Sequence, residues 1–167
     1  IGLAVRGSGI GVALVLLFML VYYKRGGLIA DAAVLINIFL QLTVLATFGA
    51  AMTLPGIAGI ALTVGMGVDG SVLINERIRE EQRAGKTARA AIEIGFGRAL
   101  SAIVDGNLTT LISAIVLAQY GSGPVKGFAV TLTVGVLINL FTAVVVSRTF
   151  FELWARGFGR KTHLDIG

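Results

Sequence analysis

Cysteine is absent from this sequence of 167 residues, and histidine and charged residues are scarce. Without cysteine, the chain can form neither a disulfide framework nor a cysteine-based metal site. A single histidine, His163, argues against a histidine-ligated metal site. Charged residues make up 14% of the chain, against about 25% in ordinary soluble domains. The shortage of charge therefore excludes an ordinary soluble domain.

Long uncharged runs take the place of the missing charge. Hydrophobic residues make up 56% of the chain, and its mean hydropathy is +0.90. Because about 20 apolar residues in a helix cross a bilayer, these runs predict an all-α membrane protein with a bundle of five transmembrane helices. Pro55 suits the first turn of the third helix, where its missing N–H costs nothing. The predicted spans are residues 7–24, 28–48, 54–75, 100–119 and 126–148.

Two polar segments lie outside these spans. Residues 76–97 are densely charged before Gly85 and then carry apolar side chains on one face of a helix, with Arg89 and Glu93 on the other. This pattern predicts a short amphipathic cytoplasmic helix at the membrane surface; a solvated loop helix without lipid contact is the alternative. Residues 153–167 are predicted to form a cytoplasmic basic tail.

The basic residues are distributed unevenly over the predicted loops. Five spans place the loops alternately on two sides, and only Arg6 and Lys126 of the 14 basic residues fall on the second side. Since lysine and arginine accumulate on the cytoplasmic side, we expect a cytoplasmic C-terminus and an exterior N-terminus. The net charge of +5 then reflects topology and attraction to anionic lipid, not nucleic-acid binding. Because the sequence opens at Ile1 without a signal peptide, we expect it to be part of a longer chain.

Asp69 lies inside the third predicted span. It is 14 residues beyond Pro55, roughly 20 Å along the helix at about 1.5 Å per residue. A charged carboxylate in hydrocarbon costs about 2.5–3.5 kcal/mol even on lenient insertion scales. The neighbouring face carries small residues at helical spacing, which let another helix approach closely: Gly56, Gly59, Thr63, Gly67 and Gly70. We therefore expect Asp69 to face a helix interface and not lipid.

Asp105 lies at a similar depth in the fourth predicted span. Arg98 lies on the same helix face as Asp105, two turns nearer the cytoplasm. Glu76 has the same relation to Asp69 in the third span. We therefore expect the two aspartates to lie opposite each other in the membrane. By the same reasoning, Glu76 is expected near Arg98 at the cytoplasmic interface. A carboxylate in such a setting can bind and release a proton, which is the chemistry of a relay; a residue held by Ser, Thr and Asn neighbours for packing specificity is the alternative.

Further polar side chains occur within the predicted spans. Each one alone is typical of an interhelical hydrogen bond worth about 0.6 kcal/mol. As a group they predict a polar seam inside the bundle. The set comprises Asn37, Gln41, Asn107, Thr109, Thr110, Thr131, Thr133 and Asn139.

The sequence contains no arrangement typical of a soluble catalytic site. Gly85-Lys86-Thr87 is similar to the end of a phosphate-binding loop, but such a loop needs glycine at position 80, which is Glu80. There is no Ser-His-Asp pattern for nucleophilic catalysis either. We therefore expect neither an enzyme nor a cofactor.

Four blocks of the sequence resemble a known family. They are residues 14–24, 53–81, 105–110 and 121–132, and they follow one another in the family's order. On these blocks the chain is similar to the SecD members of the SecD/SecF family of protein-export membrane proteins, within the resistance-nodulation-division (RND) superfamily. The family usually has Ala-Asn where this chain has Gly70-Ser71, an aromatic residue where it has Asn75, and Ala or Ser where it has Gly106.

The resemblance implies a fold and a function. The fold would be half of an RND-type transmembrane domain, preceded in the full chain by another span and a large exterior domain. The function would be to use proton or sodium flow to promote late steps of preprotein export across the bacterial inner membrane. The relay residues would be Asp69, Asp105, Asn107 and Thr109. Partners would be SecF, the SecY-SecE-SecG channel, the translocating preprotein and membrane lipids.

Two other functions remain open at this point. One is an RND exporter of small molecules or lipids, which shares a glycine-rich span with an acidic residue. The other is a scaffold that binds the export channel without transporting an ion. The scaffold predicts that Asp69→Asn leaves export intact, whereas the relay predicts that it does not.

Overall fold

The computed structural model describes residues 2–47, 54–157 and 166, and most of this part of the chain is helical. Five helical rods are long and apolar enough to cross a membrane, so the predicted all-α bundle of five spans is confirmed. The predicted connection between the second and third spans, residues 49–53, and most of the basic tail, including His163, lie outside the described residues. The elements in chain order are α1 Gly2–Tyr23, α2 Arg25–Thr47, α3 Leu54–Arg83, α4 Ala88–Tyr120, α5 Pro124–Phe141, the π-helix η1 Thr142–Ser147 and α6 Arg148–Gly157.

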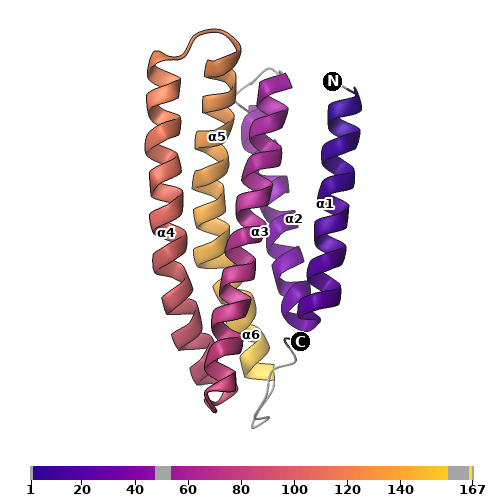
Figure 1. The fold of residues 1–167 in the computed structure, drawn as a ribbon, viewed down its shortest axis with the longest axis vertical. Coiled ribbons are helices and arrows are strands. Elements are labelled where there is room, and N and C mark those ends of the chain that lie inside the picture. The colour runs from indigo at the N-terminus through magenta and orange to yellow at the C-terminus, as the bar shows by residue number, and fades with distance from the viewer. Residues whose placement is uncertain (1, 48–53, 158–165, 167) are drawn as a thin grey trace.

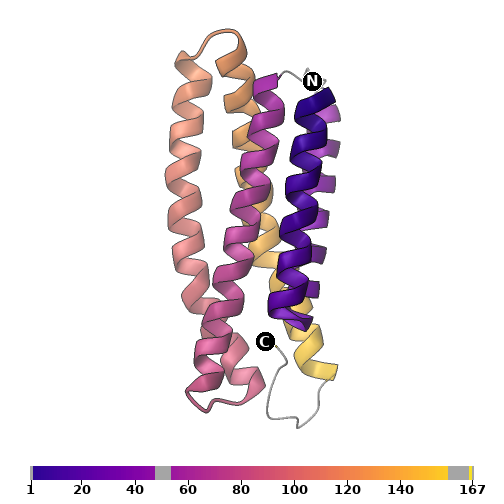
Figure 2. The ribbon, with the colours of Figure 1, turned by 45° about the vertical axis from the view of Figure 1, so that its right-hand side comes forward.

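The rods stand side by side, with α1 at one edge of the bundle and α4 at the other (Figure 1). The turn between α1 and α2, the turn between α3 and α4, and α6 all lie at one end, which we call the basic end. The turn between α4 and α5 lies at the opposite end, as does the start of α1 (Figure 2). This arrangement places Lys24, Arg89 and Arg156 at the same end, in agreement with the expected charge asymmetry.

Glycines allow α3 to approach its neighbours closely. A Cβ atom on Gly95 of α4 would lie 2.7 Å from the backbone nitrogen of Ile78, so α4 contacts the backbone of α3 there. A Cβ on Gly59 would lie 3.2 Å from Thr131 of α5. The small-residue face predicted for the third span therefore faces α5, as close helix packing in membranes requires.

The segment 76–97 forms the protruding ends of two spans. Helix α3 continues to Arg83, and α4 begins at Ala88 after a turn in which Gly85 has a φ of +83°. Ile78 and Phe96 are buried in one apolar cluster, which holds the two helix ends together. The structure thus corrects the expectation of a separate amphipathic helix: residues 88–97 are the first turns of α4, and their apolar side chains Ile92 and Phe96 are buried in the same cluster as Ile78 of α3.

Two apolar clusters divide the interior of the bundle along its length. The larger one lies toward the basic end and includes Ile103 of α4 and Ala143 of η1. The smaller one includes Ala114 of α4 and Val136 of α5. The stretch between them, from 104 to 113 on α4 and from 137 to 142 on the fifth rod, is where buried polar side chains meet.

Candidate functional site

A buried hydrogen-bonded group, which we call the asparagine seam, joins three rods in the middle of the bundle. Asn139 of α5 donates from Nδ2 to Oδ1 of Asn107 on α4 at 3.1 Å. Asn37 of α2 donates from Nδ2 to Oγ1 of Thr142 at 3.0 Å, with a longer contact of 3.5 Å to Asn139 Oδ1. All four side chains are buried. The predicted polar seam is confirmed for the three asparagines, and Thr142 is a member that sequence reasoning missed.

A second buried pair lies one turn along α2. Thr63 of α3 donates from Oγ1 to Oε1 of Gln41 at 3.0 Å. A Cβ on Gly135 of α5 would lie 2.5 Å from Gln41 Nε2, so only glycine leaves room for this amide. Gln41 Nε2 has no hydrogen-bond partner among the described residues. A free amide donor is therefore held inside the membrane part of the bundle.

The π-helix η1 interrupts the fifth rod beside the asparagine seam. Short π-helical turns inside α-helices are frequent at functional sites. A cavity of about 10 Å³ lies there, large enough for a single water molecule. It is lined by Asn37, Gly67, Asn139, Thr142 and Ser147, among others. Asn37 Oδ1 has no partner among the described residues, so an acceptor lies beside this cavity.

The two predicted relay carboxylates lie on the outer surface of the bundle. Asp69 of α3 and Asp105 of α4 are both exposed. Neither side-chain carboxylate forms a hydrogen bond or an ion pair with any residue that the structure describes. The expected opposition of the two side chains is therefore not formed within this bundle, and their packing against other helices stays a prediction.

Asp105 belongs to a line of exposed polar residues, which we call the α4 polar stripe. Its members follow one another at intervals of four residues: Ser101, Asp105, Thr109 and Ser113. Thr109 Oγ1 donates to the carbonyl oxygen of Asp105 at 3.0 Å, and Ser113 Oγ donates to that of Thr109 at 3.1 Å. The hydroxyls of Thr109 and Ser113 are thus satisfied by their own helix, whereas the Asp105 carboxylate has no partner among the described residues.

The predicted contact between Glu76 and Arg98 is not formed. Glu76 Oε1 accepts from the hydroxyl of Tyr23 at 3.0 Å and from Arg79 Nη1 at 3.3 Å. Arg98 instead forms an ion pair with Glu81. Side chains lean toward the N-terminus of their helix. Arg98 on α4 therefore leans toward the basic end, whereas Glu81 on α3, which runs the opposite way, leans away from that end and toward Arg98. This lean explains why the charge pair between the two helices uses Glu81 and not Glu76.

Glu81 joins the ends of α3 and α4 at the cytoplasmic side. Its buried carboxylate is bonded by Lys86 and by Arg98. Glu81 lies outside the membrane span, because the apolar part of α3 ends near residue 75. The hydrogen bond from Lys86, together with the positive charge of Arg98, holds the pKa of Glu81 below its ordinary value. The carboxylate therefore remains charged at neutral pH and links the two helices.

Asn75, which replaces an aromatic residue usual in the resembling family, is fully buried. Its Nδ2 donates to the carbonyl oxygen of Ser71 at 2.9 Å. A Cβ on Gly26 of α2 would lie 2.4 Å from Asn75 Oδ1. The amide therefore fits because Gly26 faces it, and the departure from the family pattern has a matching small residue on the neighbouring helix.

Asp31 is an intramembrane carboxylate that sequence reasoning did not single out. It lies on α2, two turns from the start of the helix, and is buried. Its Oδ1 has no partner among the described residues. The sequence did contain a signal, because Asp31 lies within an apolar run. It was not singled out because it lies near the start of the predicted span, where a charged residue is common at a helix end.

The sequence matches a family and several curated relatives. A family model described as "Protein export membrane protein SecD/SecF, C-terminal" matches residues 3–157. The chain is 59% identical over 145 residues to the protein translocase subunit SecD of Syntrophobacter fumaroxidans, covering 87% of this chain and 27% of that protein. It is 56% identical over 144 residues to the same subunit of Desulfurispirillum indicum, covering 86% and 28%. The chain thus spans about a quarter of the length of these relatives.

The fold is similar to that of a solved structure from the same group. The crystal structure of SecDF from Thermus thermophilus, described as a translocon-associated membrane protein, superposes with a TM-score of 0.88 at 42% identity. The match covers 96% of this chain and 22% of that one. Together with the five apolar helices, these relatives indicate a multi-pass protein of the bacterial inner membrane. The resemblance read from the sequence blocks is confirmed: the chain belongs to the SecD/SecF family of protein export membrane proteins.

Proposed function

We propose that this bundle couples the movement of protons or sodium ions across the inner membrane to late steps of preprotein export. The role is energy coupling within a translocase and not enzymatic catalysis. The observation that carries the proposal is the position of Asp69 and Asp105. Both carboxylates lie within predicted membrane spans and on the outer surface of the bundle, and neither has a neutralising partner among the described residues.

A bare carboxylate facing lipid would be costly, so these surfaces need a cover. The cost is about 2.5–3.5 kcal/mol for each charge on insertion scales. The α4 polar stripe also favours contact with helices, because small hydroxyl residues allow close approach. We propose that the cover is a second bundle supplied by SecF, which would complete an RND-type transmembrane domain. The relatives are several times longer than this chain, which leaves room for such further parts.

The chemistry of coupling would act at the interface between the two bundles. A cation bound at Asp69 or Asp105 neutralises the carboxylate and changes which neighbours it prefers. A membrane potential of 100 mV supplies about 2.3 kcal/mol for each charge moved, which is comparable to the insertion cost. Asn107, close to Asp105 on α4, is bonded to Asn139 of α5. A movement of α4 would therefore also move α5, through the hydrogen bond between Asn107 and Asn139.

The proposed partners outside the membrane part are the SecY-SecE-SecG channel and the translocating preprotein. The exterior domain expected in the full chain would hold the preprotein, and the bundle would move that domain. An exporter of small molecules or lipids is the competing function. It predicts that Asp69→Asn abolishes efflux of such compounds and leaves preprotein translocation unchanged.

The test is preprotein translocation into inverted membrane vesicles that carry the full-length protein, with and without a proton gradient. We expect Asp69→Asn to abolish the stimulation by the gradient and Asp105→Asn to reduce it. Glu80→Gln is the matched control, since Glu80 is an exposed carboxylate on the same helix that pairs with Arg77 outside the apolar span. Repeating the assay with a sodium gradient identifies the ion. Unchanged gradient dependence in Asp69→Asn would show a scaffold and refute the coupling role.

A further inference from the structure

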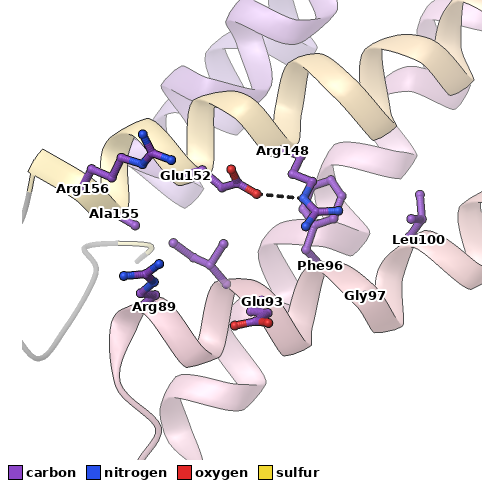
Figure 3. Close-up of a pocket in the computed structure, with 10 residues that line it drawn as sticks. Arg89, Glu93, Phe96, Gly97, Leu100, Arg148, Glu152, Ala155 and Arg156 are labelled. Atoms are coloured by element: carbon purple, nitrogen blue, oxygen red, sulfur yellow. Dashed lines mark hydrogen bonds and ion pairs between the residues drawn. The ribbon is translucent and has the colours of Figure 1, made fainter.

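A pocket of about 460 Å³ opens at the basic end between α4 and α6 (Figure 3). Its α4 side presents Arg89, Ile92, Phe96 and Leu100, while Arg148 and Arg156 come from α6. None of these side chains belongs to the asparagine seam or to the α4 polar stripe. The pocket is therefore a separate feature from the proposed coupling site.

The lining of the pocket changes from apolar to cationic along its length. Leu100 lies at one end, and Arg89 and Arg156 lie at the other (Figure 3). Leu100 lies eleven positions beyond Arg89 on α4, about 16 Å of helix. Since the apolar span begins near residue 100, the pocket runs from the edge of the hydrocarbon into the cytoplasmic headgroup layer. This gradient suits a molecule with a charged head and an apolar tail.

The charges around the pocket favour an anionic head. Arg148 Nε bonds Glu152 Oε1 at 2.8 Å, so these two compensate each other. Glu93 is the other acid in the lining. Arg89 and Arg156 form no ion pair with any residue in the described ranges. Three arginines against two glutamates leave an excess positive charge at the cytoplasmic mouth, where planar guanidinium groups can bind phosphate through paired hydrogen bonds.

We propose that this pocket binds an anionic glycerophospholipid of the cytoplasmic leaflet. Arg89 and Arg156 hold the phosphodiester, and an acyl chain lies along Phe96 and Leu100. Basic pockets between transmembrane helices at this level of the membrane match the chemistry of phospholipid headgroups. The binding also fixes α6 to the start of α4, next to the hairpin that Glu81 closes.

The test uses the full-length protein in detergent, with phosphatidylglycerol added and bound lipid counted by native mass spectrometry. Because the double variant Arg89→Gln, Arg156→Gln loses two charge-assisted hydrogen-bonding groups, we expect it to bind at least about tenfold more weakly. Arg83→Gln is the matched control, because Arg83 is an exposed arginine at the same end that does not line the pocket. It should bind as the wild type does.

A second variant fills the pocket without changing its charge. Gly97 lines the pocket, and a Cβ there would meet nothing within 4 Å, so Gly97→Trp adds bulk to open space. We expect it to exclude the lipid, whereas Gly9→Trp, at an equally open position on α1, should not. Fold integrity is checked by the unfolding temperature of each variant.

Three results would overturn the proposal. Equal binding of phosphatidylcholine would show that no anionic head is recognised. Displacement of the lipid by inorganic phosphate at equal concentration would show an anion site without a lipid tail. Equal loss of binding in Arg83→Gln would show a diffuse surface effect. The readout needs neither an ion gradient nor a preprotein, so failure here is distinct from failure of the coupling role.

Discussion

Asn139 of α5 donates to Asn107 of α4 at 3.1 Å in the interior of the bundle, where both side chains are buried. The bond links the helix that carries Asp105 to the rod that carries the π-helix. Because both amides are buried from bulk water, each depends on the other for its hydrogen bonding.

Replacing Asn139 with leucine should destabilise the bundle by about 1–3 kcal/mol, since Asn107 and Asn37 then lose a buried partner. The measurement is unfolding in mixed micelles with increasing sodium dodecyl sulfate. Ser113→Ala serves as control, because Ser113 is exposed and bonds only its own helix; its effect should stay within about 0.5 kcal/mol. Wild-type stability in Asn139→Leu would mean that the seam contributes nothing to folding.

Gly135→Ala should destabilise the bundle by about 1–3 kcal/mol through overpacking. The new methyl group would lie 2.5 Å from Gln41 Nε2 and from Thr63 Cγ2. Gly65→Ala is the matched control, since a Cβ there meets nothing within 4 Å, and it should be neutral or slightly stabilising. Combining Gly135→Ala with Gln41→Ala should recover part of the loss, as measured by unfolding temperature. An equal effect of both alanines would argue against close contact at Gly135.

Acid should weaken the α3–α4 hairpin through Glu81. Because the pKa of Glu81 is lower in the folded than in the unfolded state, its charged form stabilises the fold above the ordinary glutamate value of about 4.3. This contribution is lost as the pH falls through the lowered folded value. The unfolding temperature should therefore fall less steeply from pH 6 to pH 3 in Glu81→Gln than in the wild type. Glu80→Gln should keep the wild-type slope, and identical slopes in all three proteins would contradict the assignment.

The α4 polar stripe should be shielded from lipid in the assembled protein. A spin label at Thr109 in the full-length complex should show several-fold lower accessibility to oxygen than a label at Val104. Both positions are exposed in this bundle, but they lie on different sides of the helix, and only Thr109 belongs to the stripe. Electron paramagnetic resonance in proteoliposomes provides the measurement. Equal, high accessibility at both sites would mean that lipid covers the stripe.

The spans and the asparagine seam could be predicted from sequence because their signals are local. A run of about 20 apolar residues has few alternatives to a transmembrane helix, and an amide such as Asn37 within such a run must find a partner inside the bundle. The sequence also shows that Asn75 stands where the family usually has an aromatic residue. Its fit against Gly26 could not be predicted, because that contact joins positions 49 residues apart.

Three features could not be predicted, because they depend on how the helices pack. The partner of Arg98 follows from the lean of side chains on two antiparallel helices, which the linear spacing of Glu76 and Arg98 does not contain. The hairpin at residues 76–97 follows from burial of Ile78 against α4. The π-helix at Thr142 has no composition of its own and forms where the fifth rod meets its neighbours.

The π-helix has a consequence for how the chain can change length. A π-helical turn accommodates one residue more than an α-helical turn, so the segment 142–147 holds a residue that a regular helix would not need. Deleting Val145, which is exposed, would convert the turn to α-helix and leave α5 and α6 facing their present neighbours. The same deletion within α5 would rotate everything after it by about 100° and move Phe151 out of the core. The fifth rod thus has one place where insertions and deletions are absorbed without loss of register.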